Sequence, residues 1–221
     1  DRNNDLNIPK GVNPEQPFVQ ILDPATGTGT FLVEVIDLVH KTMVEKWRSE
    51  GHKGVKITNL WNKYVPEYLL PRIHGYELMM APYTIAHLKL GLKLLETEYG
   101  FGSAERARVY LTNSLEPSQS QINVPDIVPA LAHEAEEVNH IKNTQCFTII
   151  VGNPPYSDSV TTNSWITNLI KVFKEGLDEQ KSDLNREEGK FIRLIPELAG
   201  PETPHIGAFV INNTFLKAIT H

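Results

Sequence analysis

The chain has 221 residues, 40% hydrophobic and 22% charged, which is typical of a globular domain and excludes a disordered or collagen-like chain. It contains 21 basic and 27 acidic residues, and the net charge of -6 argues against an autonomous nucleic-acid-binding module, because such modules normally carry excess positive charge. No apolar run approaches the roughly 18–20 residues of a membrane span. The single cysteine, Cys146, excludes a disulfide framework and a cysteine-based zinc site.

Short apolar runs that predict strands alternate with helical periodicity along the chain. Strands are expected at 17–23, 71–77, 108–114, 146–152 and 207–213. Helices are expected around 32–43, 80–99, 131–138 and 166–177. We also expect a poorly structured leader at 1–17, an inserted helical segment at 47–70 and a charged surface stretch at 180–190.

The clearest helix is the one at 80–99, which has Pro82 near its first turn and Gly100 after its end. Its apolar residues follow one another at steps of four and three positions in turn: Ala81, Ile85, Leu88, Leu92 and Leu95.

Strands that alternate with helices, each strand nearly all apolar, predict an α/β fold with a doubly wound, mostly parallel sheet covered on both faces. Ligands of such sheets bind beyond the carboxyl ends of the strands. The polar residues at these ends are Asp23, Glu77, Asn113 and Asn153. We therefore expect the functional site at this edge.

The segment DPATGTGTFL, residues 23–32, combines a strand end, a glycine turn and a helix start. Gly27 and Gly29 permit a tight turn and a close approach to a ligand. A phosphate-binding P-loop needs Lys and Ser or Thr after the glycines, and a dinucleotide fingerprint needs a third glycine where Leu32 stands. A nucleoside with a charged tail and no phosphate fits better; the alternative is a plain strand–helix turn.

Two further strand ends fit a nucleoside ligand. Glu77 can accept hydrogen bonds from both ribose hydroxyls, and the alternative is an exposed charge at a strand terminus. The Asn113 side-chain carbonyl can accept from an adenine amino group, although asparagine is also common at loop starts.

The turn Asn153-Pro154-Pro155-Tyr156 is the sharpest feature of the sequence. The two prolines restrict the backbone and hold Asn153 in one geometry. The Asn153 side-chain oxygen and the Pro154 carbonyl can accept the two N–H bonds of an exocyclic amine and aim its lone pair at an electrophile. Tyr156 can stack on an extruded base.

Together, DPATGTGTFL and VGNPPY resemble the amino-methylating, S-adenosylmethionine-dependent DNA methyltransferases that make N6-methyladenine. Local segments, among them GYELMMAPYTIAHLKL at 75–90 and GKFIRLI at 189–195, are similar to the methyltransferase region of single-chain Type I-like (Type ISP) restriction-modification enzymes. The resemblance implies a Rossmann-like methyltransferase fold over residues 1–221 and bound S-adenosylmethionine. The implied cofactor-binding residues are Asp23, Pro24, Ala25, Thr26, Gly27, Gly29, Glu77 and Asn113, and the implied target-base residues are Asn153, Pro154, Pro155 and Tyr156.

The resemblance also sets expectations beyond the chain. The partner is double-stranded DNA with a flipped adenine, and recognition, nuclease or helicase domains are fused or associated. The target recognition domain and a Tyr-Thr-Pro-like cofactor segment are absent, so we expect a fragment of a longer bacterial or archaeal cytoplasmic protein. No metal is expected, because the eight histidines are scattered.

Three alternatives to adenine methylation remain open at this stage. Cytosine N4 and protein glutamine amides are also planar nitrogens that the NPPY turn can bind. The domain can also be a non-catalytic S-adenosylmethionine-binding scaffold within a restriction complex.

Overall fold

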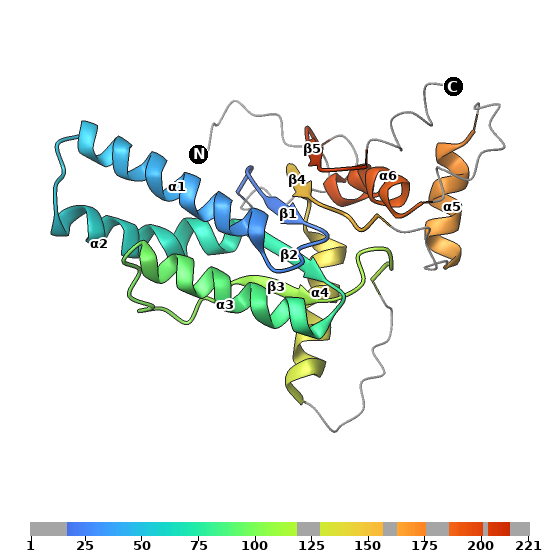
Figure 1. Cartoon of the computed structure of the whole chain (residues 1–221), viewed down its shortest axis with the longest axis horizontal. Helices are drawn as coiled ribbons and strands as arrows, with labels where there is room; N and C mark the ends of the chain where they lie inside the picture. The colour runs from blue at the N-terminus through green and yellow to red at the C-terminus, as the bar shows by residue number, and fades with distance from the viewer. Residues whose placement is uncertain (1–16, 119–128, 157–162, 176–185, 201–202, 213–221) are drawn as a thin grey trace.

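The structure, a computed structural model, describes residues 17–118, 129–156, 163–175, 186–200 and 203–212 (Figure 1). The helices are α1 Thr30–Ser49, α2 Val55–Tyr64, η1 Val65–Leu69, η2 Leu70–Arg72, α3 Met80–Glu96, α4 Pro129–Thr144, α5 Ser164–Phe173 and α6 Glu187–Ala199. The strands are β1 Ile21–Asp23, β2 Ile73–Glu77, β3 Arg108–Leu111, β4 Ile149–Gly152 and β5 Ile206–Phe209. The expected leader at 1–17 lies outside the described residues except for Pro17.

The five strands form one parallel sheet in the order β3-β2-β1-β4-β5. The predicted α/β fold with a parallel sheet is therefore confirmed, and each strand is shorter than its apolar run. The strand order reverses between β1 and β4. Among the described residues, no helix is long and apolar enough to cross a membrane.

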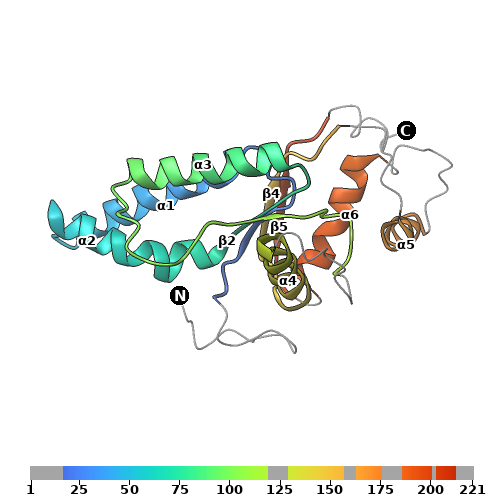
Figure 2. The same ribbon diagram turned by 90° about the horizontal axis from the view of Figure 1, so that it is seen from below.

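Alternating side chains divide the core between the two faces of the sheet. Ile21 and Ile73 pack into the cluster formed by α1, α2 and α3. Leu22, next to Ile21, and Tyr76, three residues after Ile73, point to the other face and join the opposite cluster with residues of α4 and α6. Figure 2 shows α1 and α3 grouped together and α4 and α6 on the other side of the strands.

The segment at 47–70 contains the end of α1, then α2, η1 and the start of η2, and it packs into the first cluster. Trp47, Trp61 and Leu70 are buried there. The Trp61 indole donates a hydrogen bond to Thr97 Oγ1 at 2.9 Å, so its polar atom is satisfied inside the core.

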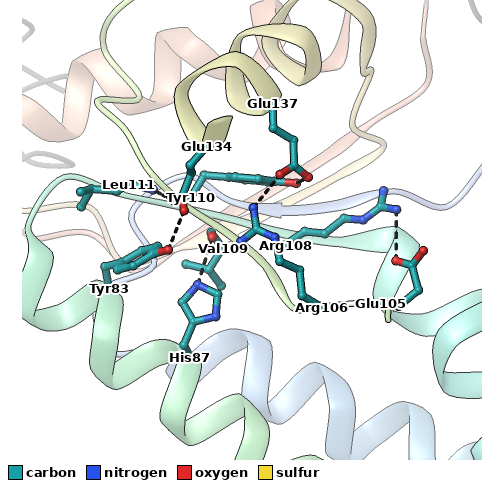
Figure 3. Close-up of polar contacts among 10 residues, drawn as sticks. All are labelled: Tyr83, His87, Glu105, Arg106, Arg108, Val109, Tyr110, Leu111, Glu134 and Glu137. Carbon is teal, nitrogen blue, oxygen red and sulfur yellow. Dashed lines mark hydrogen bonds and ion pairs between the residues drawn. The ribbon is translucent and has the colours of Figure 1, made fainter. Parts of the chain in front are cut away.

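The outer edge of β3 is closed by side chains of two helices (Figure 3). Glu134 of α4 accepts a hydrogen bond from the Leu111 backbone N–H at 2.9 Å, and Tyr83 of α3 donates to the other oxygen of Glu134 at 2.8 Å. His87 Nε2 lies 3.1 Å from the Val109 carbonyl oxygen. These contacts occupy backbone groups that an exposed edge strand offers to other chains.

The apolar row predicted on α3 faces solvent. Ile85, Leu88, Leu92 and Leu95 are between 44% and 62% exposed. The side of α3 that packs into the core instead carries Ala86, Leu90 and Leu94, each almost fully buried.

The prediction of a surface location for the charged stretch 180–190 is wrong for its last residues. Residues 180–185 lie outside the described part, but Glu187, Glu188 and Lys190 are buried at the start of α6. Opposite charges make this burial tolerable, because Lys190 Nζ lies 3.7 Å from Glu187 and Arg186 Nε lies 3.6 Å from Glu188.

Gly29 is expected to be sensitive to substitution for two separate reasons. Its φ of 79° is left-handed, and an added methyl group would lie 3.2 Å from the Ala86 Cβ. Gly29→Ala should therefore lower the free energy of unfolding by more than the 1–2 kcal/mol or so of left-handed backbone alone. Gly51→Ala is the matched control, because Gly51 has a φ of 88° and no neighbour within 4 Å of an added methyl group. The free energy of unfolding of both variants is measured by denaturant titration. An equal loss in Gly29→Ala and Gly51→Ala would contradict a tight α1–α3 contact at Gly29.

Candidate active site

The two sequence motifs meet where the strand order reverses. Asp23 ends β1, Asn153 directly follows β4, and these two strands are paired. A methyl group built on Gly152 would lie 2.9 Å from Asp23 Oδ1, so the backbone leading into Asn153 runs close against this carboxylate. Parallel sheets of this type bind ligands at such a reversal.

The glycine turn is held against the neighbouring strand. Gly27 and Gly29 have φ values of 54° and 79°, in the left-handed region that glycine adopts without strain. The Thr26 backbone N–H donates to the Tyr76 carbonyl at 3.0 Å, and the Thr26 hydroxyl donates to the Asp23 carbonyl at 2.9 Å. These contacts fix the path of the turn between β1 and α1.

The Asp23 carboxylate is fully buried at the base of this turn. Its Oδ1 accepts a hydrogen bond from the Ala25 N–H at 3.0 Å, whereas Oδ2 has no hydrogen-bond partner among the described residues. The pKa of Asp23 is raised to about 7, mainly because the carboxyl group is buried; the Ala25 hydrogen bond opposes this rise, and the nearby negative charge of Glu77 adds to it. Oδ2 therefore keeps an unused acceptor position at the buried base of the turn.

The Glu77 carboxylate binds backbone N–H groups of two loops. Its Oε2 accepts from the Gly27 N–H and its Oε1 accepts from the Met79 N–H, both at 2.8 Å. Each carboxylate oxygen has two lone-pair positions, so both can accept one further hydrogen bond. The predicted contact of Glu77 with ribose hydroxyls is compatible with this arrangement.

Asn113 lies two residues beyond β3, in a loop that the structure ties down. Its side-chain oxygen accepts from the Leu115 N–H and its amide donates to Glu116 Oε1, both at 3.0 Å. Lys142 of α4 donates to the Asn113 carbonyl at 2.7 Å and to the Glu116 carbonyl at 3.0 Å. The loop is also joined to the glycine turn, because the Ser114 hydroxyl donates to the Pro24 carbonyl at 2.5 Å.

The NPPY turn presents its polar side chains to solvent. Asn153 and Pro155 are exposed, Pro154 is buried and Tyr156 is 45% exposed. The Tyr156 hydroxyl contacts Asn153 Oδ1 and lies 3.2 Å from the carbonyl oxygen of Val210. The asparagine oxygen is therefore reachable from outside and is bonded within its own turn.

A pocket of about 240 Å³ is lined in part by the loop that follows β3. Its lining includes Tyr76, Lys142, Trp165 and Glu197, but neither Asp23 nor Asn153. It therefore does not coincide with the meeting point of the two motifs.

Two residues that hold the loops of the candidate site in place could not be predicted from the sequence. Lys142 and Ser114 act through backbone carbonyls that only the folded chain brings near them. A lone lysine in a helix and a serine after a strand are common on any protein surface.

A parallel sheet whose strand order reverses is typical of α/β proteins that bind ligands at the reversal, and both motifs lie there. The chain belongs to the family UPF0020, the RMKL-like methyltransferase domain, whose model matches residues 11–198. It is therefore a methyltransferase domain, and all predicted site residues lie inside the matched range. No curated protein matches the chain in sequence.

Solved structures share the fold at low sequence identity. The DrdV–DNA complex aligns over 93% of this chain with a TM-score of 0.62 and 23% identity. The ATP-dependent Type ISP restriction-modification enzyme LlaBIII, bound to DNA, aligns over 90% with a TM-score of 0.64 and 20% identity. A nuclease-deletion mutant of the Type ISP enzyme LlaGI, in complex with a DNA substrate mimic, aligns over 80% with a TM-score of 0.58 and 20% identity.

These alignments confirm the expected likeness to Type ISP enzymes at the level of the fold. The chain spans only 18%, 13% and 14% of the lengths of the three structures, respectively.

Proposed function

We propose that this domain transfers a methyl group from S-adenosylmethionine to the N6 amine of adenine in double-stranded DNA. The observation that carries the proposal is the close approach of the NPPY turn to Asp23 at the strand reversal. One small pair of substrates, a cofactor and a flipped base, can reach both motifs there.

The residues of the glycine turn suit this cofactor. S-adenosylmethionine supplies a methyl group on a positively charged sulfonium, together with an α-amino group. The unpartnered Oδ2 of the buried Asp23 favours a cationic ligand, and Glu77 keeps acceptor capacity for two hydroxyls. Asp23, Gly27, Gly29 and Glu77 would hold the cofactor, and Asn113 would face its adenine.

The residues of the NPPY turn would supply orientation. An adenine amine is a weak nucleophile because its lone pair is delocalised into the ring. Acceptance of its two N–H bonds by Asn153 Oδ1 and the Pro154 carbonyl would keep the nitrogen nearer to tetrahedral and aim the lone pair at the methyl carbon. The new C–N bond replaces the S–C bond, and the amine then releases one proton to solvent.

Asn153 Oδ1 can accept the target amine while it keeps its contact with Tyr156. The Tyr156 hydroxyl uses one of the two lone-pair positions of this oxygen, and the second stays available for an N–H bond of the amine. The partly exposed Tyr156 ring would stack on the flipped base.

We also propose that the domain works within a longer restriction-modification polypeptide, alongside recognition, nuclease or motor domains. The net charge of -6 supports this, because a domain with excess negative charge needs other parts to hold DNA.

The choice of acceptor is tested by nucleoside mass spectrometry. DNA incubated with the complete protein and S-adenosylmethionine is digested, and the expected product is N6-methyladenine. Detection of 4-methylcytosine would replace adenine by cytosine as the acceptor. Cofactor binding without any modified base would indicate a scaffold or a protein substrate.

Two substitutions at Tyr156 separate the role of its ring from that of its hydroxyl. Tyr156→Phe keeps the stacking surface, and we expect kcat/KM for DNA to stay within about threefold of wild type. Tyr156→Ala removes the ring, and a stacking loss of 1–3 kcal/mol predicts a decrease of about 5- to 160-fold. Equal losses in both variants, measured with radiolabelled cofactor, would assign the role to the hydroxyl.

A further inference from the structure

The outward side of α3 carries a row of apolar side chains that we call the α3 stripe. The α3 stripe consists of Ala81, Ile85, Leu88, Leu92 and Leu95, all of them exposed. Its four large members are each at least 44% exposed. The opposite side of the same helix packs against α1 and the sheet.

A helix that is apolar on two opposite sides is normally covered on both. In the described part of the chain, α3 is covered on one side only: Ala86 and Leu90 are buried, whereas Leu88 and Leu92 remain 62% and 52% exposed. Contiguous exposed apolar surface of this kind marks an interaction site.

The spacing of the residues in the α3 stripe indicates the kind of structure that can pack against it. Steps of four, three, four and three residues follow the a and d positions of a heptad repeat, which is the pattern of a coiled-coil seam. Ile85 stands at an a position and Leu88 at a d position, a combination typical of two-stranded packing. The partner that fits is another α-helix.

The small extent of the α3 stripe favours a tethered partner. A stable interface between separate proteins buries about 800 Å² on each side, from roughly 20–30 residues. Five side chains on one helix cannot supply that area. A helix linked to this domain in one polypeptide can bind through a smaller area, because tethering raises the effective concentration of the helix.

A second copy of this chain is a poorer partner for the same face. Antiparallel self-pairing would set Leu88 of one copy against Leu92 of the other and bring the two Lys89 side chains near the symmetry axis. Two like charges there would repel. Lys89, which donates to the Thr30 hydroxyl at 3.1 Å, instead favours a partner helix with an acidic residue beside its apolar row.

We propose that the α3 stripe is the docking face for an amphipathic helix of an adjoining domain in the same polypeptide. The proposal rests on the adjoining domains inferred above and is independent of methyl transfer. The structures that share this fold are consistent with it, because the domain spans less than a fifth of each of their chains.

Cysteine accessibility tests this docking face. Leu92→Cys is introduced into the 221-residue chain and into the polypeptide of the complete reading frame, and its maleimide labelling rate is followed by peptide mass spectrometry. Thr42→Cys, at an exposed position of α1, is the matched control. We expect Leu92→Cys to react at least tenfold more slowly in the complete polypeptide and Thr42→Cys to react equally in both.

Three results would overturn the proposal. The first is equal labelling of Leu92→Cys in the two polypeptides. The second is concentration-dependent protection within the 221-residue chain, with light scattering showing a dimer, which would make a second copy the partner. The third is a complete reading frame that holds no further domain. Methyl transfer is measured separately on the same samples, so its failure leaves this test intact.

Discussion

Replacement of Asn153 by alanine is expected to lower kcat for methyl transfer by about 10²–10³, the loss typical of removing one preorganised hydrogen-bonding group from a reaction centre. The variant removes the side-chain oxygen that would hold the target amine. Because Asn153 is exposed and directly follows β4, its loss should leave the sheet intact. The measurement is single-turnover transfer of a radiolabelled methyl group to DNA at saturating cofactor.

Two controls accompany this variant. The thermal midpoint should stay within a degree or so of wild type, and the Kd for S-adenosylmethionine should be unchanged, because Asn153 is assigned to the target base. Thr167→Ala, a similar truncation at an exposed position of α5, should transfer methyl groups at the wild-type rate. A fully active Asn153→Ala protein would refute the assigned role.

Replacement of Asp23 by asparagine is expected to weaken cofactor binding and to stabilise the fold. Loss of a buried partner for a cationic group costs about 2–5 kcal/mol, which predicts a Kd for S-adenosylmethionine raised by roughly 30- to 5,000-fold. The same change removes a fully buried carboxylate whose Oδ2 has no partner among the described residues. Isothermal titration and thermal denaturation of one variant therefore give effects of opposite sign.

The stability effect should depend on pH in a defined direction. The pKa of Asp23 is about 7 in the folded protein and 3.8 in the unfolded chain, so between these values the folded state holds a proton that the unfolded state has released. The contribution of Asp23 to stability is thus largest near pH 4, declines as pH rises to 7 and is constant above. Asp23→Asn should exceed wild type by up to about 4 kcal/mol at pH 8 and match it near pH 4.

Cofactor affinity gives an independent check on the same carboxylate. In the wild-type protein it should rise between pH 5 and pH 7, as Asp23 becomes charged, and this rise should be absent in Asp23→Asn. An Asp23→Asn protein that binds cofactor normally, or that loses stability at pH 8, would contradict the proposed role of the buried carboxylate.

The strand and helix order could be predicted because local patterns set it. Alternating apolar residues such as Ile21 and Leu22 serve opposite faces of the sheet, which only a strand covered on both sides permits. The α3 helix shows where such patterns stop being informative. Its heptad row predicts the helix correctly, but Ala86, Leu90 and Leu94 form the buried side, and the sequence does not distinguish two apolar sides of one helix.

The candidate site shows the same contrast. The position of Asp23, Glu77 and Asn153 at one edge of the sheet was predictable, because residues at the carboxyl ends of parallel strands meet there. The contacts of Lys142 with the loop at Asn113 depend on how α4 docks, and the burial of Glu187 and Glu188 depends on charges that pair only in the folded chain. Tertiary packing decides these features, and no local signal encodes them.

A crystal structure of the chain with S-adenosylhomocysteine, the demethylated cofactor, tests the central claim most directly. We predict the amino acid part of this ligand beside Asp23 and its sulfur on the side of the site that faces Asn153. Density for the ligand in the pocket lined by Lys142 and Trp165, with the strand reversal empty, would contradict the account.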